Sequence, residues 1–383
     1  MCRKKTVFFF HPSSDLYGAD KILVYVMKNF ANHDCFLILR ADGPLIEYVK
    51  KELPNVKILI MPSLPIIAKV FFNPLGIVRF FRNLILFKRQ INTVSKAKPD
   101  IVYLNTMATT PLLVLYRKTK RFVHVHEILP NNSIFNKLIN RFSLKKADCL
   151  ICVSEAVKNN LKKSMSGQDS KLHVVHNGIS FDLAENAATF KYDKTKVNIA
   201  LIGRIKPSHK GQLLLLEAIS KMDKSVRYLV HFYLVGSVVN GQEYMQKQVD
   251  DSIVNLGLSN CVEICPFVKE ISAVYQAMNI IVVPSVFDDP FPTTVLEGMF
   301  WSKPIVATRV GGVPEMIEDE ATGYIVEKYN AQMLNEKLSI LIQSPELRTT
   351  MGNAGRKRFE AFFSEESFNK RYRALLESEG IIV

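Results

Sequence analysis

The stretch from Pro284 to Glu315 restricts the fold of this chain more than any other. It begins where a short apolar, β-branched run ends (279–283, NIIVV), which is the pattern of a buried strand. A polar loop follows, then a helix predicted over 293–301, a second buried strand, and a loop containing Gly311 and Gly312. In α/β sheets, ligands bind beyond the carboxyl ends of the strands, where helix N-termini also point. The stretch therefore predicts one half of a nucleotide site.

Two acidic residues of this stretch are placed to face one crevice. Asp289 lies in the loop and Glu297 in the second turn of the predicted helix. An ionised carboxylate accepts hydrogen bonds from two hydroxyl groups at once, so the pair suits a ligand rich in hydroxyls. The alternative is that Asp289 caps the helix and Glu297 is solvated.

Length and composition are those of a globular protein with two domains. Of 383 residues, 48% are hydrophobic and 22% are charged, which is enough for two cores. Cys149 and Cys152 form a CxxC inside an apolar run, and no second pair stands at the spacing of a zinc site. We expect reduced thiols, no metal site and a cytoplasmic setting.

The net charge of +14 needs an explanation, because nucleic acid, anionic lipid and phosphorylated substrates all attract a basic surface. We expect no signal peptide, since the apolar run after the basic N-terminus is too short. No stretch reaches the roughly 18 uncharged apolar residues of a membrane-spanning helix.

Strands and helices alternate along the whole chain, which predicts an α/β fold of two Rossmann-like parallel sheets. We expect domains at 1–179 and 197–363, a linker at 180–196, and a final helix over 364–383. Strands are predicted at 5–10, 34–39, 56–61, 99–105, 122–127, 147–153 and 172–175, and then at 197–202, 231–235, 262–265, 279–283, 304–307 and 323–326. Helices are predicted at 20–30, 46–53, from 74 onward, and at 155–163, 270–278, 293–301, 330–344 and 347–363.

The loop after the first strand of the second domain reads GRIKPSHKG. Gly203 frees backbone amides for a ligand, and the cations of Arg204 and Lys210 can converge on one diphosphate. The order of residues is not that of a Walker loop. A solvated basic loop is the alternative.

In the first domain, the strand FVHVHE places His124 and His126 on the same side. We expect His124 to be a core histidine. His126 stands at the carboxyl end of the strand, where a site residue is expected. Gly18 precedes a predicted helix that Asp20 is expected to cap, and a glycine there lets the backbone approach a ligand.

The sequence PSVFDDPFPTTVLEGMFWSKPIVATRVGGVPEMI resembles the C-terminal signature of retaining glycosyltransferases of the GT-B fold, family 4 (glycosyl transferases group 1). The resemblance implies two domains facing across a cleft, with the final helix crossing back to the first. Asp289 stands where most members have Glu and would contact sugar hydroxyls, while Glu297 would hold the ribose. The other residues implied in donor binding are Gly18, Gly203, Arg204, Lys210, Gly236, Phe267, Val268, Thr293, Thr294, Gly311 and Gly312.

The resemblance also implies a mechanism. A sugar leaves a nucleotide-sugar donor, such as a UDP- or GDP-sugar, with retention of configuration. Arg204 and Lys210 stabilise the leaving diphosphate, while Asp289 and His126 (paired with Glu127) orient the sugar. Arg204, Lys210, Asp289 and His126 are the expected catalytic residues. No obligatory metal is implied, because Asp288-Asp289 is not the D-x-D of metal-dependent transferases.

Residues 63–98 combine large apolar and basic side chains and contain no acidic residue. From Asn73-Pro74 the pattern is helical, and such a helix suits an anionic membrane surface. The alternative is a helix buried on the sheet with snorkelling arginines. The apolar positions are Ile77, Phe80, Phe81, Leu84, Phe87 and Ile91, and the basic ones Arg79, Arg82, Lys88 and Arg89.

These observations predict a peripheral enzyme on the inner face of the cytoplasmic membrane. Its acceptor would be a lipid-linked saccharide, and its N-terminal run SSDLYGAD resembles that of bacterial transferases building lipopolysaccharide O-antigen or capsule. Epimerases and phosphorylases of the same fold would carry other residues. The remaining alternative is a non-enzymatic basic protein that binds membrane or nucleic acid, but aromatic and basic residues lack the interleaving of an RNA module, so we expect no nucleic-acid partner.

Overall fold

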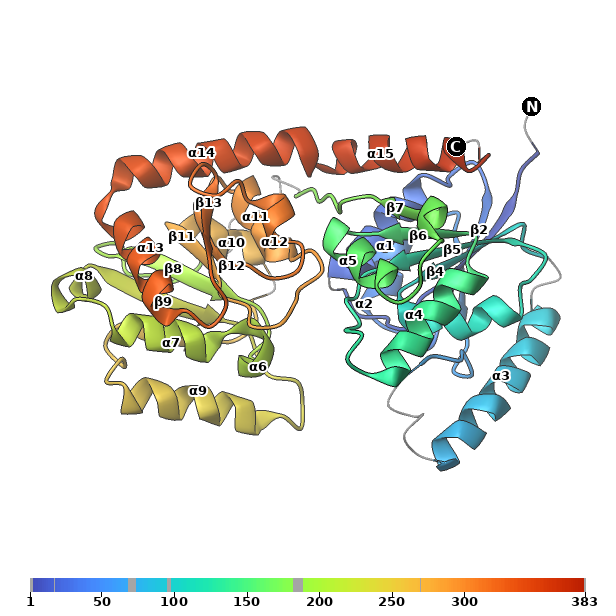
Figure 1. The fold of residues 1–383 in the computed structure, drawn as a ribbon, viewed down its shortest axis with the longest axis horizontal. Helices are drawn as coiled ribbons and strands as arrows, with labels where there is room; N and C mark the ends of the chain where they lie inside the picture. The colour runs from blue at the N-terminus through green and yellow to red at the C-terminus, as the bar shows by residue number, and fades with distance from the viewer. Residues whose placement is uncertain are drawn as a thin grey trace. The chain divides into compact units, whose positions relative to one another are not determined.

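The computed structural model describes residues 3–16, 18–67, 74–94, 98–181, 189–268 and 270–381. The chain forms two compact units, one of Met1–Gly178 with Glu365–Val383 and the other of Ile179–Ser364. Each unit has its own parallel sheet with helices on both faces (Figure 1).

The sheet of the first unit has seven strands in the order β3-β2-β1-β4-β5-β6-β7. Its strands are short apolar runs, and all but the edge strands β3 and β7 are buried along most of their length, as expected for a parallel sheet covered on both sides. The order reverses between β1 and β4, which pair in parallel with Val7 opposite Ile101. The strands are β1 (Thr6–Phe10), β2 (Asp34–Leu39), β3 (Lys57–Ile60), β4 (Ile101–Asn105), β5 (Lys120–Val125), β6 (Cys149–Cys152) and β7 (Leu172–Val174).

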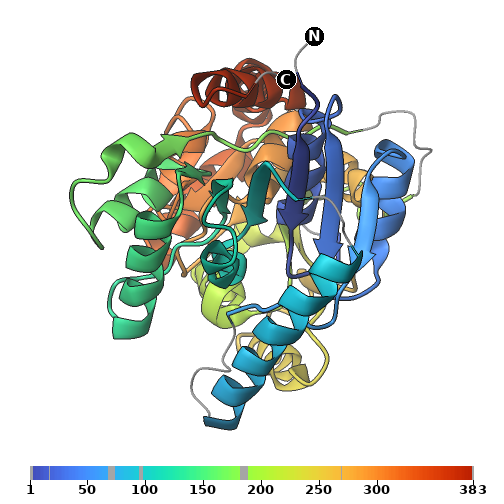
Figure 2. The ribbon, with the colours of Figure 1, turned by 90° about the vertical axis from the view of Figure 1, so that its right-hand side faces the viewer.

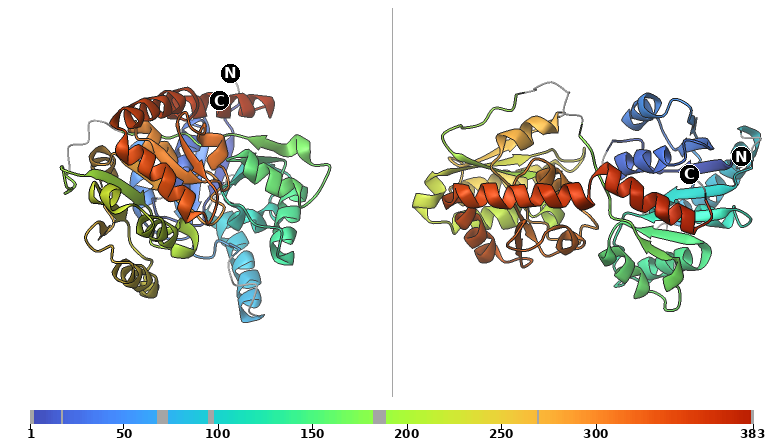
Figure 3. Two further views of the ribbon diagram at one scale, coloured as in Figure 1. Left: turned by 60° about the vertical axis from the view of Figure 1, so that its left-hand side comes forward. Right: turned by 90° about the horizontal axis from the view of Figure 1, so that it is seen from above.

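The helices of the first unit include the last helix of the chain, α15 (Glu365–Ser378), which packs against α1 (Figure 3). Helix α3 stands out from the rest of this unit (Figure 2). The other helices are α1 (Gly18–Lys28), α2 (Pro44–Glu52), α3 (Pro74–Val94), α4 (Ile134–Lys146), α5 (Glu155–Lys162), and the 3-10 helices η2 (Met107–Val114) and η3 (Asp169–Lys171).

The sheet of the second unit has six strands in the order β10-β9-β8-β11-β12-β13, with its reversal between β8 and β11. The strands are β8 (Val197–Ile202), β9 (Val230–Val235), β10 (Val262–Cys265), β11 (Ile280–Val283), β12 (Ile305–Thr308) and β13 (Gly323–Val326). The helices are α6 (Pro207–Lys210), α7 (Gln212–Ser220), α8 (Lys224–Tyr228), α9 (Glu243–Asn255), α10 (Ile271–Ala277), α11 (Thr293–Phe300), α12 (Val313–Met316), α13 (Ala331–Gln343) and α14 (Pro345–Phe362).

The predicted α/β fold of two parallel sheets is confirmed, and two local predictions are wrong. The segment after β4, predicted as a loop, forms η2, whose first backbone N–H groups are capped by the side chain of Thr106. Helix α1 begins at Gly18, so Asp20 lies in its first turn instead of at the cap position. The carboxylate of Asp20 bonds His11.

Helix α3 divides its apolar side chains between the core and solvent. Phe80, Phe87 and Ile91 are buried, and Phe87 packs edge-on against Phe10 of β1. Ile77 and Phe81, two of the apolar positions named from the sequence, are exposed, so the alternative of a helix buried on the sheet holds for only part of them. Exposed apolar side chains also include Leu75, Val78, Ile85 and Leu86, and the basic residues Arg79, Arg82, Lys88 and Arg89 are exposed beside them.

Among the helices of the described residues, none is long and apolar enough to cross a membrane.

Candidate active site

The candidate site residues of the first unit follow strands β1, β4 and β5, on both sides of the point where the strand order reverses. In parallel sheets this point is where ligands bind, because loops from the two directions diverge there. His11 comes directly after β1, Asn105 ends β4 and His126 comes directly after β5.

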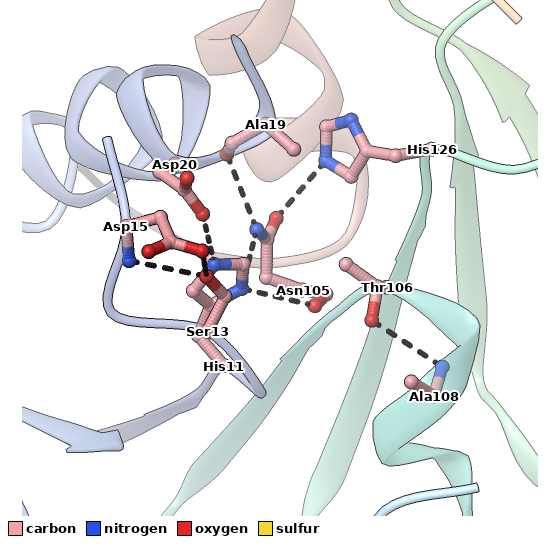
Figure 4. Close-up of polar contacts among 9 residues, drawn as sticks. All are labelled: His11, Ser13, Asp15, Ala19, Asp20, Asn105, Thr106, Ala108 and His126. Atoms are coloured by element: carbon pink, nitrogen blue, oxygen red, sulfur yellow. Dashed lines mark hydrogen bonds and ion pairs between the residues drawn. The ribbon is translucent and has the colours of Figure 1, made fainter. Parts of the chain in front are cut away.

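These three side chains and that of Asp20, in the first turn of α1, form a continuous series of hydrogen bonds (Figure 4). Nε2 of His126 lies 3.0 Å from Oδ1 of Asn105, and Nδ2 of Asn105 lies 3.0 Å from Nδ1 of His11. Nε2 of His11 then meets Oδ1 of Asp20. Asn105, His11 and Asp20 are all buried, and His126 is partly buried.

His124 is a core residue, as the sequence analysis expects. It is fully buried, and its Nδ1 lies 2.8 Å from the hydroxyl of Tyr103. Burial lowers the pKa of His124 to about 3, so its ring is neutral. The ring centroids of His124 and His126 are 4.1 Å apart, which confirms that the two residues share a side of the strand.

Glu127, which the sequence analysis pairs with His126, accepts hydrogen bonds from two backbone N–H groups. Its Oε2 lies 3.2 Å from the nitrogens of both Met107 and His126. Burial raises the pKa of Glu127 to about 7, although these two hydrogen bonds lower it. Near neutral pH the carboxyl group is therefore divided between its charged and uncharged forms.

Gly18 is the first residue of α1, so the predicted position at a helix N-terminus holds in the structure. The neighbouring Tyr17, part of the run resembling surface-polysaccharide transferases, lies outside the described residues. Ser13 and Asp15 of the same loop bond to one another, with Oγ of Ser13 3.1 Å from Oδ2 of Asp15.

In the second unit, the basic loop and the acidic loop meet through an ion pair. Nζ of Lys210, at the end of α6, lies 2.8 Å from Oδ2 of Asp289. These residues follow β8 and β11, the two strands between which the strand order reverses. Arg204 is exposed, and a Cβ added at Gly203 would meet only the side chain of Lys210, at 3.9 Å. The space beside Gly203 is therefore open to a ligand near both cations, while the N–H of Gly203 itself donates to the main-chain oxygen of Val235 over 2.9 Å.

The adjacent glycines allow the acidic loop to touch the loop after β12. A Cβ at Gly311, where φ is +49°, would lie 1.8 Å from the main-chain oxygen of Asp289. The N–H of Gly312 donates to this same oxygen over 3.0 Å. Glycine is required here because two backbones are in contact, in addition to any approach to a diphosphate.

Glu297 lies in α11, near its N-terminus, and is partly buried. The hydroxyl of Tyr275 donates to its Oε2 over 2.5 Å. Burial and the carboxylate of Glu297 raise the pKa of Tyr275 well above its usual value, so the phenol keeps its proton and acts as a donor. Thr293 and Thr294 form the first turn of α11, which begins after Pro292 without a side-chain cap.

The remaining predicted donor residues lie at the ends of β9 and β10. Gly236 directly follows β9. Phe267 and Val268 follow β10; the side chain of Phe267 is 69% exposed, and its N–H donates to Oγ of Ser237 over 3.0 Å. An exposed aromatic ring at a strand end is suited to stacking on a base.

Sequence reasoning missed His11, Asn105 and Tyr275 as possible site residues. His11 and Asn105 could have been found from their positions, since both stand at the carboxyl ends of predicted strands. Tyr275 carries no such signal, because it lies inside α10 and meets Glu297 only through the packing of the second unit.

One group of potential metal ligands lies away from the strand ends. Cys149, His173 and Glu379 bring their ligand atoms within 4.8 Å of one another. The carboxylate of Glu379 is paired with Nζ of Lys120 over 2.6 Å, and burial raises the pKa of the Cys149 thiol, so an ammonium group already balances the charge there.

Solved structures with the same fold, and family models, match most of the chain. The Anabaena protein HepE, in complex with UDP and glucose, covers 98% of this chain and 100% of its own with a TM-score of 0.80 at 20% identity. A glycosyltransferase from Rickettsia africae covers the same shares with a TM-score of 0.77 at 23% identity. The family models "Glycosyltransferase Family 4" and "Glycosyl transferases group 1" match residues 26–183 and 184–358. This chain belongs to the GT-B glycosyltransferases.

Curated relatives of this GT-B glycosyltransferase match over a shorter region. An uncharacterized glycosyltransferase from Methanocaldococcus jannaschii is 30% identical over 241 residues, 62% of either chain. The capsular polysaccharide biosynthesis glycosyltransferase CapM of Staphylococcus aureus is 28% identical over 257 residues, 63% of this chain and 66% of that protein. The matched region therefore spans somewhat less than two thirds of these relatives.

For this GT-B glycosyltransferase, the family predicted from the C-terminal signature is confirmed. Retention of configuration, the donor, the acceptor, the cleft between the domains and the roles given to single residues stay predictions.

Proposed function

We propose that this GT-B glycosyltransferase transfers a sugar from a nucleotide-sugar, with retention of configuration, to a saccharide acceptor. The observation that carries the proposal is the ion pair between Lys210 and Asp289 over 2.8 Å at the strand-order reversal of the second unit. It unites the two motifs expected to bind the diphosphate and the sugar, although they are far apart in the sequence. The solved relative from Anabaena, which binds UDP and glucose, supports a UDP-sugar as the donor.

When the donor binds, Lys210 and Asp289 exchange their ion pair for contacts with the donor. The diphosphate carries more negative charge than one carboxylate, so it competes for Lys210 and draws the ammonium group away from Asp289. Asp289 is then left to accept hydrogen bonds from sugar hydroxyls. As the glycosyl–phosphate bond breaks, charge grows on the diphosphate, and Lys210 and Arg204 stabilise that charge.

Glu297 is assigned to the ribose of the donor. A carboxylate can accept several hydrogen bonds, so the bond from Tyr275 does not exhaust it. Since the cations already balance the diphosphate charge, the proposal requires no metal ion.

A donor screen tests this proposal. The protein is mixed with UDP-, GDP- and dTDP-sugars, and its thermal stabilisation and slow donor hydrolysis are followed with and without EDTA. We expect one nucleotide-sugar to raise Tm, with no effect of EDTA, and Glu297→Ala to abolish the shift. Glu217→Ala, which removes an exposed glutamate paired with Lys221 in the same unit, should leave the shift intact. Donor binding that survives Glu297→Ala would contradict the assignment of this site.

For the acceptor, we propose a lipid-linked saccharide reached at an anionic membrane surface. The support is α3, which exposes apolar side chains beside four basic ones and contains no acidic residue. Apolar side chains enter the interface while cations meet anionic headgroups. The likeness to CapM of Staphylococcus aureus, named for capsular polysaccharide biosynthesis, is consistent with an acceptor of this kind.

Vesicle binding tests the membrane part separately. We expect co-sedimentation with phosphatidylglycerol vesicles and little with phosphatidylcholine vesicles, and a loss of binding in the double variant Phe81→Ser/Ile85→Ser. Val254→Ser, which removes an equally exposed apolar side chain from α9, is the matched control. If the protein binds vesicles tightly and binds no donor, the result favours the alternative of a non-enzymatic membrane-binding protein and contradicts the proposed transferase function.

A further inference from the structure

In the hydrogen-bond series that ends at His126, the contacts fix which group donates and which accepts. Nδ2 of Asn105 lies 3.3 Å from the main-chain oxygen of Ala19. A carbonyl oxygen only accepts, so the nitrogen of the amide must face Ala19 and its oxygen must face His126. The amide oxygen in turn only accepts, and the contact with Nε2 of His126 over 3.0 Å therefore needs a proton on that nitrogen.

The remaining contacts agree with this direction. Nδ2 of Asn105 donates to Nδ1 of His11, whose Nε2 then donates to the carboxylate of Asp20. The main-chain oxygen of Asn105 also lies 3.3 Å from Nδ1 of His11, but both atoms are acceptors in this arrangement, so they form no hydrogen bond. The two N–H groups of the Asn105 amide are therefore shared between Ala19 and His11, and its oxygen is left for His126.

We propose that Asn105, His11 and Asp20 are positioning residues that hold the proton of His126 on Nε2, so that Nδ1 is left as a hydrogen-bond acceptor for a sugar hydroxyl group. The second ring nitrogen of His126 is directed away from Asn105 (Figure 4). The part that concerns the sugar rests on the proposed function, whereas the state of the ring does not.

Two further observations support a fixed geometry. Thr106, which follows Asn105, has a φ of +100°, a value that β-branched residues rarely adopt and that persists only where the surroundings determine it. Its N–H bonds the main-chain oxygen of His124, which ties the end of β4 to β5. Burial and the neighbouring rings of His124 and His11 lower the pKa of His126, so its ring is neutral and keeps one nitrogen as an acceptor.

The first test measures the tautomer directly. Long-range ¹H–¹⁵N spectra of the histidine rings distinguish a protonated nitrogen from an unprotonated one, and His126→Gln assigns the signal. We expect His126 in the intact protein to carry its proton on Nε2, and Asn105→Ala to give a mixture of the two tautomers. Asp20→Asn keeps an acceptor for His11 and should preserve the wild-type state. A proton on Nδ1 in the wild type, or an unchanged ring in Asn105→Ala, overturns the proposal.

The second test concerns transfer. With the donor found in the screen, Asn105→Ala should lower kcat by about 10- to 100-fold with little change in the KM of the donor, because the ring is misplaced. The double variant Asn105→Ala/His126→Gln should be no slower than His126→Gln alone, because both changes remove one function. Asn140→Ala removes a buried asparagine of the same unit that bonds Leu129 and Asn131, and its effect should add independently.

These outcomes separate the two proposals. If no donor is bound, the proposed function fails, while the spectra still decide the state of His126. If the tautomer is as expected but Asn105→Ala retains wild-type kcat, the role of the ring in transfer is wrong and the donor site in the second unit is unaffected.

Discussion

In both units the candidate residues lie where the strand order of the sheet reverses. The two sets of residues differ in their burial and in how they are bonded. In the first unit the polar groups at the strand-order reversal are buried and bonded to one another, with Asn105 at 0% and Asp20 at 3% exposure. In the second unit the charged groups are accessible, with the side chains of Lys210 and Asp289 at 34% and 21% exposure. A buried and satisfied network fixes geometry before any ligand arrives, whereas an accessible ion pair can exchange partners when an anion binds.

The largest effect on activity is expected when the ammonium group of Lys210 is removed from the second unit. Lys210→Ala should lower kcat/KM by about 10²- to 10³-fold, because the charge that grows on the diphosphate loses a stabilising partner. Lys210→Arg keeps the charge and should recover part of the activity. Steady-state kinetics with the donor found in the screen provides the measurement.

The control for this variant is Lys221→Ala, which removes a lysine of the same unit that pairs with Glu217 at the surface. Its kinetics should match the wild type. Equal losses in the two variants would show that general positive charge, and not the position of Lys210, is what matters.

The contact between the acidic loop and the glycine loop predicts a loss of stability. Gly311→Ala places a Cβ 1.8 Å from the main-chain oxygen of Asp289 at a φ of +49°. The free energy of unfolding should fall by more than about 2 kcal/mol, through backbone strain and displacement of the loop. Donor-induced stabilisation should fall as well, since Asp289 moves.

Gly257→Ala is the matched control, because φ is +64° there and nothing lies within 4 Å of the added Cβ. It should cost about 1 kcal/mol from backbone strain alone. Thermal unfolding of both variants, with and without donor, separates the loss of stability caused by backbone strain from the loss caused by contact with Asp289. Similar Tm values for the two variants would mean that the acidic loop moves away from the added Cβ at little cost in free energy.

The difference between the units also explains which parts of the molecule are predictable from the sequence. The strands are predictable because most of them are short apolar runs that are buried on both faces of the sheet. The donor-site residues of the second unit lie in contiguous motifs, so Arg204, Lys210 and Glu297 could be found by spacing. The sequence patterns do not predict helices α4, α6, α7, α8, α9 and α12, and they predict a loop where η2 forms.

The network of the first unit could not be predicted in the same way. His11 and Asn105 are far apart in the sequence, and only the pairing of β1 with β4 brings them within 3.0 Å. The sequence predicts Asp20 as a helix cap, because a carboxylate near a helix N-terminus commonly takes that position. Its partner depends on the contact between a loop and a strand end, which local patterns do not contain.

The carboxyl group of Glu127 gives the stability of the first unit a dependence on pH. Its pKa is raised by burial from 4.5 to about 7 in the folded protein. Between these two pH values the folded state holds the proton more tightly than the unfolded state, so stability falls as pH rises. The loss amounts to about 1–3 kcal/mol and is complete above pH 7.

Glu127→Gln removes this effect while keeping an oxygen that accepts from Met107 and His126. Urea unfolding at a series of pH values should show the variant gaining on the wild type between pH 4.5 and 7. The rings of His124 and His126 change stability in the opposite direction, because burial lowers their pKa values. The difference between variant and wild type isolates Glu127, and parallel curves would mean that its carboxyl titrates normally.

The smallest expected effect tests whether the second unit, too, contains a fixed element. Tyr275→Phe removes the hydroxyl that donates to Oε2 of Glu297 over 2.5 Å, in the one part of the donor site that resembles the buried network of the first unit. The Kd of the donor should rise by about 3- to 10-fold, because the carboxylate loses a bond that orients it. Tyr233→Phe is the matched control: this hydroxyl, in the same unit, accepts from the N–H of Asp193 over 3.1 Å. If isothermal titration gives the same Kd for both variants, Glu297 does not need its neighbour to bind the donor, and orientation by buried hydrogen bonds is confined to the first unit.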